Sequence, residues 1–256
     1  MVDVSSERVL SSDAHIAIEI TEGEGPAVIW LGGFRSDMTG GKAMAVSDWG
    51  MRNGRKVVRF DYRGHGASEG DFKDYTISDW LDDARLVLSR YGGQSAVAVG
   101  SSMGGWIGLL LARDRAAAGI PLGGLVLVAP AADFTERLMW PRLPDNIRAE
   151  ITDKGIAYLP SDYGDPYPIT ARLFEDGRQH LLYTDDLIET GCPVHILQGV
   201  QDPDVPYGHA LELVDRLAAD DVVTTLIKDG DHRLSREEDI ARLVAAVDRM
   251  AARQEP

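Results

Sequence analysis

Apolar positions in this chain gather in short runs, and the segments between these runs carry apolar residues at helical spacing. Several runs are apolar almost throughout rather than alternating, which is typical of strands covered on both faces. The predicted strands are residues 15–20, 27–33, 56–62, 95–101, 124–131, 193–199 and 222–228.

The clearest predicted helix is "TISDWLDDARLVLSRYG", with Thr76 or Ser78 as N-cap and Gly92 as its end. Its aspartates, Asp83 among them, are expected on a solvated face rather than in a metal site. Further helices are predicted over 105–119, 207–219 and 235–253. This alternation predicts an α/β fold: a mostly parallel sheet with helices on both faces.

Residues 133–190 interrupt the alternation. They are rich in proline and aromatic residues and contain no clear strand of sheet length. Because a structureless loop of that length is improbable inside a compact domain, we expect a small helical insertion. It would form a cap over the carboxyl edge of the sheet, where open α/β folds bind ligands. The alternative is a surface subdomain with no role at the site.

Length and charge narrow the classes of protein. The 256 residues suit one α/β domain, and a formal net charge of −15 argues against binding nucleic acid or anionic membranes. A single cysteine, Cys192, excludes an internal disulfide and a cysteine-rich metal site. The first residues lack a signal-peptide pattern, and no apolar stretch reaches membrane-spanning length. We therefore expect a cytoplasmic protein.

Candidate chemistry centres on "GSSMG", residues 100–104, which fits G-x-S-x-G with Ser102 at its centre. The motif follows a predicted strand and precedes a predicted helix, as a nucleophile elbow requires. Flanking glycines allow the sharp turn that exposes the central side chain. We therefore predict that Ser102 is a nucleophile and that Ser101 has a packing or hydrogen-bonding role.

A serine nucleophile needs a base and an orienting acid. Of six histidines, only His232 lies in a loop directly between the last predicted strand and the last predicted helix. Asp202 follows the strand at 193–199 and is the predicted acid, with Asp204 and Asp133 as alternatives. The order Ser…Asp…His is that of α/β-hydrolases. The other histidines are His15, His65, His180, His195 and His209.

The turn "LGGFRSD" after the second predicted strand offers a further backbone donor. We predict that the N–H groups of Phe34 and Met103 form an oxyanion hole. Candidate residues for an apolar acyl pocket are Trp140, Leu143 and Tyr158. Three arginines are candidates for contacting an anionic substrate: Arg35, Arg142 and Arg172.

These motifs together resemble the α/β-hydrolase fold family along nearly the whole chain. "FDYRGHGAS" is similar to the family's strand and glycine turn, "GVQDPDVP" to its acid turn, and "GDH" carries the histidine. More narrowly, "GGFRSDMTGGKAMA", "VGSSMGGW", "AAD", "KGIAYLPSDY" and "DHRLSREEDI" resemble the branch called alpha/beta-hydrolase domain-containing protein ten. That resemblance implies a palmitoyl-protein thioesterase that also cleaves acyl glucuronides.

The expected activity is hydrolysis of carboxylic esters or thioesters through an acyl-enzyme, without cofactor or metal. The substrate would be a small acyl compound or an acylated protein. Peptidases and C–C bond hydrolases use the same three residues, so they stay open as alternatives. A ligand-binding protein without catalysis on the same scaffold is the contrasting class.

Overall fold

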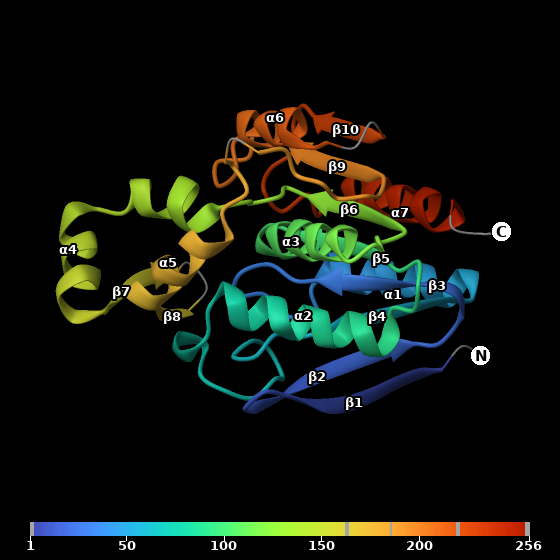
Figure 1. Ribbon diagram of the computed structural model, residues 1–256, viewed down its shortest axis with the longest axis horizontal. Coiled ribbons are helices and arrows are strands. Elements are labelled where there is room, and N and C mark those ends of the chain that lie inside the picture. Colours follow the sequence, from blue (N-terminus) through green and yellow to red (C-terminus); the bar gives the residue numbers. More distant parts are fainter. Residues whose placement is uncertain (1–2, 162–163, 185, 219–220, 254–256) are drawn as a thin grey trace.

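The computed structural model describes residues 3–161, 164–184, 186–218 and 221–253. Its centre is an eight-stranded sheet in the order β1-β2-β4-β3-β5-β6-β9-β10 (Figure 1). All pairs from β4 to β10 are parallel, whereas β1–β2 and β2–β4 are antiparallel. The strands are β1 (Val4–Ser11), β2 (Ala14–Thr21), β3 (Glu24–Leu31), β4 (Arg55–Phe60), β5 (Val97–Ser101), β6 (Gly124–Val128), β9 (Val194–Gly199) and β10 (Val222–Ile227). All seven predicted strands are confirmed, and the α/β class with them.

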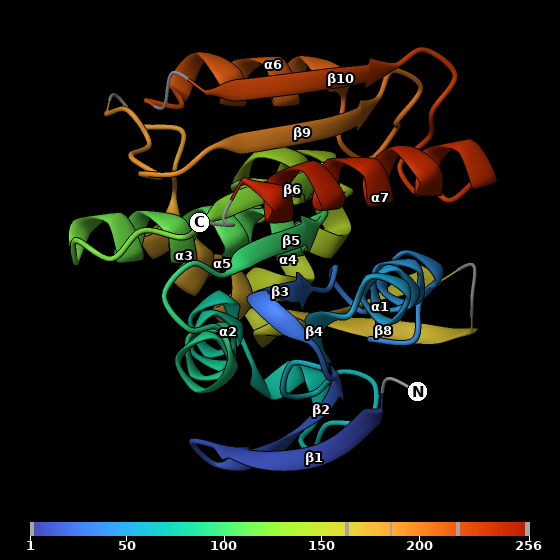
Figure 2. The same cartoon turned by 90° about the vertical axis from the view of Figure 1, so that its right-hand side faces the viewer.

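Helices cover both faces of this sheet (Figure 2). Helices α1 (Gly41–Asn53) and α7 (Glu237–Ala252) pack on one face, where their apolar residues form a core with the inward side chains of β3 and β5. The other face is covered by α2 (Ile77–Tyr91), α3 (Met103–Ala117) and α6 (Tyr207–Arg216), which bury the larger core. The fully buried central strands explain why their sequences are apolar on both sides.

Helix α2 begins and ends where the sequence predicts. The N–H of Thr76 donates to the Asp79 carboxylate at 2.9 Å, and Gly92 is the C-cap. The prediction of a solvated acidic face is wrong for Asp83, which is fully buried. Its carboxylate accepts hydrogen bonds from Ser11 and from Arg63, so a buried ion pair replaces the expected contact with water.

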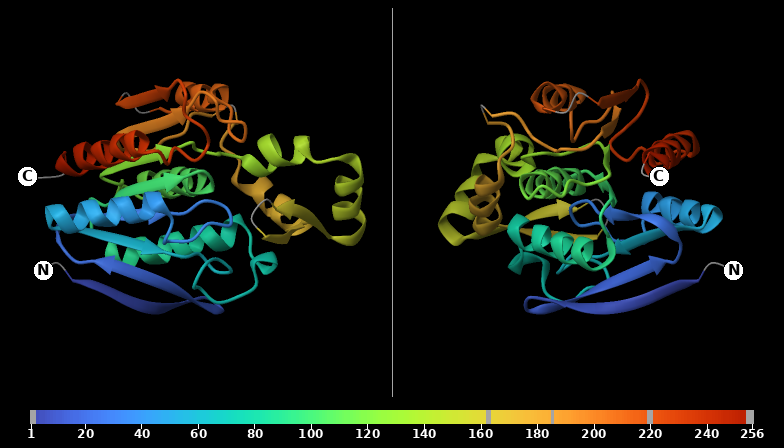
Figure 3. Two further views of the ribbon diagram at one scale, coloured as in Figure 1. Left: turned by 180° about the vertical axis from the view of Figure 1, so that it is seen from behind. Right: turned by 45° about the vertical axis from the view of Figure 1, so that its right-hand side comes forward.

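The segment between β6 and β9 lies outside the main sheet, beyond the edge at which the parallel strands end (Figures 1 and 3). The expectation of a small helical insertion is correct only in part, because besides its helices the segment contains an antiparallel hairpin of β7 (Ile156–Ser161) and β8 (Gly164–Thr170). These strands could not be predicted from the sequence, because they contain prolines at positions 160, 166 and 168, and proline within a run argues against a strand. A two-stranded hairpin tolerates them because proline is permitted on edge strands. The helices of this segment are α4 (Asp145–Lys154) and α5 (Ala171–Gly177), with short turns η2 (Thr135–Met139), η3 (Trp140–Arg142) and η4 (Arg178–His180).

Asp133 joins the two ends of this insertion. Its carboxylate is buried and accepts the backbone N–H groups of Leu182 and Tyr183 at 2.8 to 3.0 Å. On the other side, Ser78 Oγ at the start of α2 donates to Asp176 in α5 at 2.6 Å. The insertion is thus attached to the sheet domain at both ends and along one flank. Within the described ranges, no helix is long and apolar enough to cross a membrane.

Candidate active site

Ser102 stands at the junction between β5 and α3. Its backbone has φ 54° and ψ −116°, a conformation that L-residues adopt only under constraint. The flanking glycines are required by close contacts: a Cβ at Gly104 would lie 2.0 Å from the carbonyl oxygen of Leu31, and one at Gly100 would lie 2.2 Å from that of Gly104. The G-x-S-x-G spacing therefore reflects packing of the turn against β3.

Left-handed backbone conformations gather at this end of the sheet. Besides Ser102, and apart from Ser12 in the turn between β1 and β2, four non-glycine residues with positive φ follow the carboxyl ends of the parallel strands: Arg35, Ala129, Asp133 and Leu234. Strain of about 1–3 kcal/mol per residue persists only where the surroundings enforce it, and such residues concentrate at functional sites. The loops after β3, β5, β6 and β10 are thus held in unusual conformations at one rim.

His232 reaches Ser102 from the loop between β10 and α7. Its Nε2 lies 3.1 Å from Ser102 Oγ, and its Nδ1 lies 2.8 Å from Asp202 Oδ2. Because a carboxylate can only accept, Nδ1 carries the proton and donates to Asp202. Nε2 is then the free acceptor and receives the hydrogen bond of the Ser102 hydroxyl. The structure brings together three side chains separated by 100 and 30 positions in the chain.

Asp202 is held in a turn directly after β9, and its side chain is fully buried. Oδ1 accepts the backbone N–H groups of Asp204 and Val205 at 2.9 and 2.8 Å. Oδ2 accepts from His232 and, at 3.2 Å, from the Gln198 side chain. A carboxylate so fully hydrogen-bonded has one orientation and directs a buried negative charge at the imidazole.

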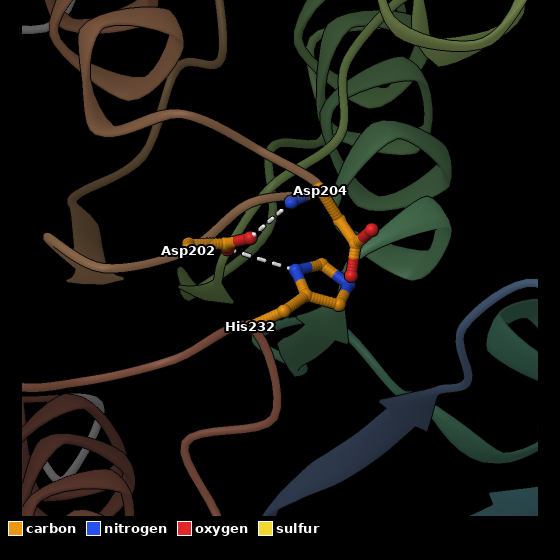
Figure 4. Close-up of side chains that lie close together, drawn as sticks. All are labelled: Asp202, Asp204 and His232. Carbon is orange, nitrogen blue, oxygen red and sulfur yellow. Dashed lines mark hydrogen bonds and ion pairs between the residues drawn. The ribbon is translucent and has the colours of Figure 1, made fainter.

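Asp204, one of the alternative acids, lies on the same turn with an exposed side chain close to the imidazole ring (Figure 4). Three potential metal ligands lie close together here, because one ligand atom of each of Asp202, Asp204 and His232 lies within 4.8 Å of the other two. This set fits a metal poorly, because the Asp202 oxygens already accept four hydrogen bonds and His232 Nδ1 donates one of them. An ion there would have to break the contact between Asp202 and His232.

The remaining acid and histidine candidates have other partners. Asp133 binds the amides described above, and burial raises the pKa of its carboxyl. His209 Nε2 donates to the Ala132 carbonyl at 2.9 Å, and burial lowers its pKa to about 4. His180 Nε2 lies 2.7 Å from Ser78 Oγ, and His195 Nε2 lies 3.1 Å from Thr225 Oγ1. His15 Nδ1, on β2, lies 2.9 Å from Glu69 Oε2 in the loop after β4.

The loop after β3 brings Phe34 beside the elbow. A Cβ built at Gly33 would lie 3.5 Å from the Cβ of Ser102, so the two turns are in contact. Met103 is the first residue of α3, and its N–H therefore has no acceptor within the helix. The next residue after Phe34, Arg35, donates its backbone N–H to Nε2 of the buried His65 at 3.2 Å.

The bond between His65, in the turn "GHG", and Arg35 could not be predicted from the sequence, because the residues around a histidine do not indicate its tertiary partner. His65 Nδ1 donates to the Arg63 carbonyl at 3.2 Å, so the ring is a neutral connector. Burial lowers the pKa of His65 to about 4, which keeps the ring neutral near pH 7. His65 thus holds the loop that carries Phe34.

The predicted pocket residues lie in the insertion. Trp140 is half-buried with its ring centroid 4.8 Å from that of Phe174, Leu143 is buried, and Tyr158 is exposed on β7. Their role in a pocket stays a prediction. A larger aromatic group surrounds Phe34, which sequence spacing could not reveal because its members come from four different segments. Four rings have their centroids 5.1 to 6.5 Å from that of Phe34: Phe72, Trp80, Phe134 and Tyr167.

The three candidate arginines have different surroundings. The guanidinium of Arg35 lies over the Tyr167 ring, 4.1 Å from its centroid. Arg142 Nη1 donates to the carbonyls of Pro203 and Asp204 at 3.0 and 2.9 Å, which connects η3 to the acid turn. Arg172 donates to the Asp74 carbonyl at 3.2 Å and is exposed.

Residues 39–246 match the model of the alpha/beta hydrolase family. The chain belongs to this family. It is a hydrolase, and the predictions of fold family and enzyme class are confirmed.

Relatives agree with the narrower resemblance. The mouse palmitoyl-protein thioesterase ABHD10, mitochondrial, is 34% identical over 236 residues, covering 91% of this chain and 78% of that protein. The structure of mouse alpha/beta hydrolase domain-containing protein 10 superposes with a TM-score of 0.86, at 31% identity, and covers 98% of this chain and all of that chain. A hydrolase structure from Agrobacterium vitis S4 gives a TM-score of 0.90 at 48% identity, over 98% of this chain and 99% of that one.

Proposed function

We propose that this hydrolase cleaves carboxylic esters or thioesters, with Ser102 as nucleophile, His232 as general base and acid, and Asp202 as the residue that orients His232. The observation that carries the proposal is the continuous hydrogen-bonded chain from Ser102 Oγ through His232 to Asp202 Oδ2, at 3.1 and 2.8 Å. Nucleophile, base and orienting acid lie within hydrogen-bonding reach in the required order.

In the first half of the reaction, His232 Nε2 takes the Ser102 proton as Oγ bonds to the acyl carbon. The N–H groups of Phe34 and Met103 donate to the oxyanion, and Asp202 stabilises the imidazolium. Collapse of the tetrahedral intermediate breaks the bond to oxygen or sulfur, and the leaving group takes the proton from Nε2. Water then gives a proton to His232 Nε2 and attacks the acyl carbon of the acyl-enzyme. As the bond from that carbon to Ser102 Oγ breaks and the acid leaves, Nε2 returns the proton to Oγ and restores the hydroxyl.

The type of bond that is cleaved is inferred from the chemistry of the three side chains and from the names of the relatives. An uncharged serine activated by a neutral imidazole suits an acyl carbon with a good leaving group. The mouse relative is named a palmitoyl-protein thioesterase, which favours thioesters of fatty acids among such substrates. We propose acyl esters and thioesters as one class, because the same attack and the same oxyanion occur in both.

We further propose that residues 133–190 act as a cap in one hydrolase domain. Three contacts support this: Arg35 stacks on Tyr167, Phe34 packs near the same ring, and Arg142 donates to the acid turn. The insertion therefore contacts both the oxyanion loop and the acid loop. Trp140 and Leu143 would line the acyl side of that cap. We also propose that this chain acts in the cytoplasm, whereas the mouse thioesterase is named as a mitochondrial protein.

The decisive experiment compares Ser102→Ala with Ser101→Ala. We expect Ser102→Ala to lower kcat for p-nitrophenyl esters and acyl thioesters by about 10⁴-fold or more. Ser101→Ala is the matched control, since Ser101 is the preceding, buried serine of the same motif. A fluorophosphonate probe should label the wild type at Ser102 only. Equal activity of both variants would refute the assignment.

A substrate panel tests the bond class. Esters and thioesters of graded chain length, with and without an appended carboxylate, are compared by kcat/KM. A preference for peptides or for carbon–carbon bonds over every acyl ester would replace the proposed class with one of the alternatives. Absence of both turnover and fluorophosphonate labelling would favour a binding protein without catalysis.

A further inference from the structure

Gln198 is a buried polar side chain beside the acid turn that no sequence motif singles out. It is the second-last residue of β9, four positions before Asp202, and its exposed fraction is 0%. A carboxamide in a core normally has hydrogen-bond partners that explain its presence. Its contacts are therefore informative about its role.

The amide nitrogen of Gln198 faces three acceptors. Nε2 lies 3.0 Å from the Gly199 carbonyl, 2.9 Å from the Val205 carbonyl and 3.2 Å from Asp202 Oδ2. Its two protons must be shared among these three oxygens. Oε1 has no partner among the described residues. The reverse orientation would place Oε1 against three acceptors, so the donor half of the amide faces the turn.

We propose that Gln198 is a positioning residue that fixes Asp202 Oδ2 for its contact with His232, an inference that rests on the proposed function. The backbone amides of Asp204 and Val205 hold only Oδ1. Oδ2, the oxygen that receives His232 Nδ1, has Gln198 as its other donor. Gln198 also holds the carbonyls at both ends of the turn, Gly199 and Val205.

Without this donor, only the contact with His232 itself would hold Oδ2, and the carboxylate could rotate more freely about its Cβ–Cγ bond. The imidazole would then lose the fixed direction of its partner, although Ser102, His232 and Asp202 all remain. Active-site groups need to be held within about 0.5 Å and 10–20° of the productive geometry, and supporting hydrogen bonds provide this. Gln198 touches no reacting atom, so its effect should fall on kcat rather than on substrate binding.

The test is Gln198→Met, which keeps length and volume and removes the donor. We expect kcat for a p-nitrophenyl ester to fall about tenfold while KM stays within about twofold. The rate of fluorophosphonate labelling at Ser102 should fall by a similar factor, and the downfield proton resonance of His232 Nδ1–H should broaden. Thr190→Val is the matched control. It removes a different buried hydrogen bond, from Thr190 Oγ1 to the Cys192 carbonyl at 3.1 Å, which lies just before the amino-terminal end of β9 and so at the opposite end of this strand from the turn.

Unfolding midpoints are measured for both variants. Unchanged kcat in folded Gln198→Met, or an equal loss in Thr190→Val, would overturn the proposal. If Gln198→Met does not fold, Gln198→Asn replaces it, because the amide is kept but withdrawn by about 1.5 Å. Full kcat in that variant would also overturn the proposal. Failure of the proposed function looks different, since Ser102→Ala would then keep its activity.

Discussion

The imidazole of His65 accepts the backbone N–H of Arg35 at 3.2 Å, although 30 residues separate them. This bond fixes the loop in which Phe34 precedes Arg35, and Arg35 itself has φ 58°. The loop after β4 therefore supports the loop after β3 at the point where the oxyanion donor is proposed. The loop after β4 is itself fixed to β2, where the Glu69 N–H donates to the His15 carbonyl at 2.9 Å, so the contact between His65 and Arg35 has consequences for both activity and stability.

Replacing His65 with leucine should loosen this loop. The Arg35 N–H would lose its acceptor, and a buried unpaired donor destabilises a protein by about 1–3 kcal/mol. We expect kcat to fall about tenfold, less than the ~10²–10³-fold loss expected for an oxyanion donor itself. Ester turnover and urea unfolding measure the two effects. His195→Leu is the control, because His195 is also a buried histidine but bonds Thr225 of the neighbouring strand β10 and neither of these loops.

The same histidine makes stability depend on pH. Burial lowers the pKa of His65 to about 4 in the folded state, against 6.5 for the unfolded chain. Between these two pH values the unfolded state therefore binds more protons than the folded state. The free energy of unfolding of the protein consequently falls as the pH drops from 6.5 to 4. The contribution of His65 is about 3 kcal/mol, complete above pH 6.5 and lost near pH 4.

Urea unfolding at several pH values between 7.5 and 4.5 checks this expectation. His65→Leu provides the reference, because buried carboxyls such as Asp133 titrate in the same range in both proteins. The difference in unfolding free energy between wild type and variant should shrink steadily as the pH falls. A constant difference over this range would show that His65 does not titrate as its burial demands.

Much of this site could be predicted from sequence because its signals are local. "GSSMG" carries both the proposed nucleophile and the glycines that its turn requires, and the positions of Asp202 and His232 follow from the strands before them. Strands that are buried on both faces produce apolar runs such as residues 95–101, so the parallel sheet was also predictable.

The missed elements lack such signals. Helix α1 buries small residues, among them Ala43, Ser47 and Gly50, and has no side-chain N-cap, so its pattern is faint. Strand β1 is an edge strand with only two buried positions. The β7–β8 hairpin is concealed by prolines. Contacts between distant segments, such as His65 with Arg35 or Asp83 with Arg63, cannot be inferred from one sequence because only the tertiary fold brings the partners together.

The two strand-end acids can be separated by paired substitutions. Asp202→Asn should lower kcat by about 10⁴-fold, because the amide keeps the shape of the carboxylate but not the charge that orients His232. Asp133→Asn should keep kcat and lose about 2 kcal/mol of stability, because an amide group would face the N–H groups of Leu182 and Tyr183. Ester kinetics and urea unfolding on both variants are sufficient. The reverse pattern would make Asp133 the acid.

The elbow glycine offers the sharpest steric prediction. In Gly104→Ala the new methyl group would meet the Leu31 carbonyl oxygen at 2.0 Å, and both atoms belong to or adjoin backbone that cannot move aside. We expect α3 to shift away from β3, which should lower the free energy of unfolding by about 3 kcal/mol or more and abolish nearly all activity. Gly208→Ala in α6 is the control, because a Cβ there meets no atom within 4 Å. That variant should be stabilised by up to about 1 kcal/mol at unchanged kcat. Thermal unfolding and ester turnover of the two variants measure this contrast. An active and stable Gly104→Ala protein would mean that the turn does not need the close approach to β3 that the structure shows.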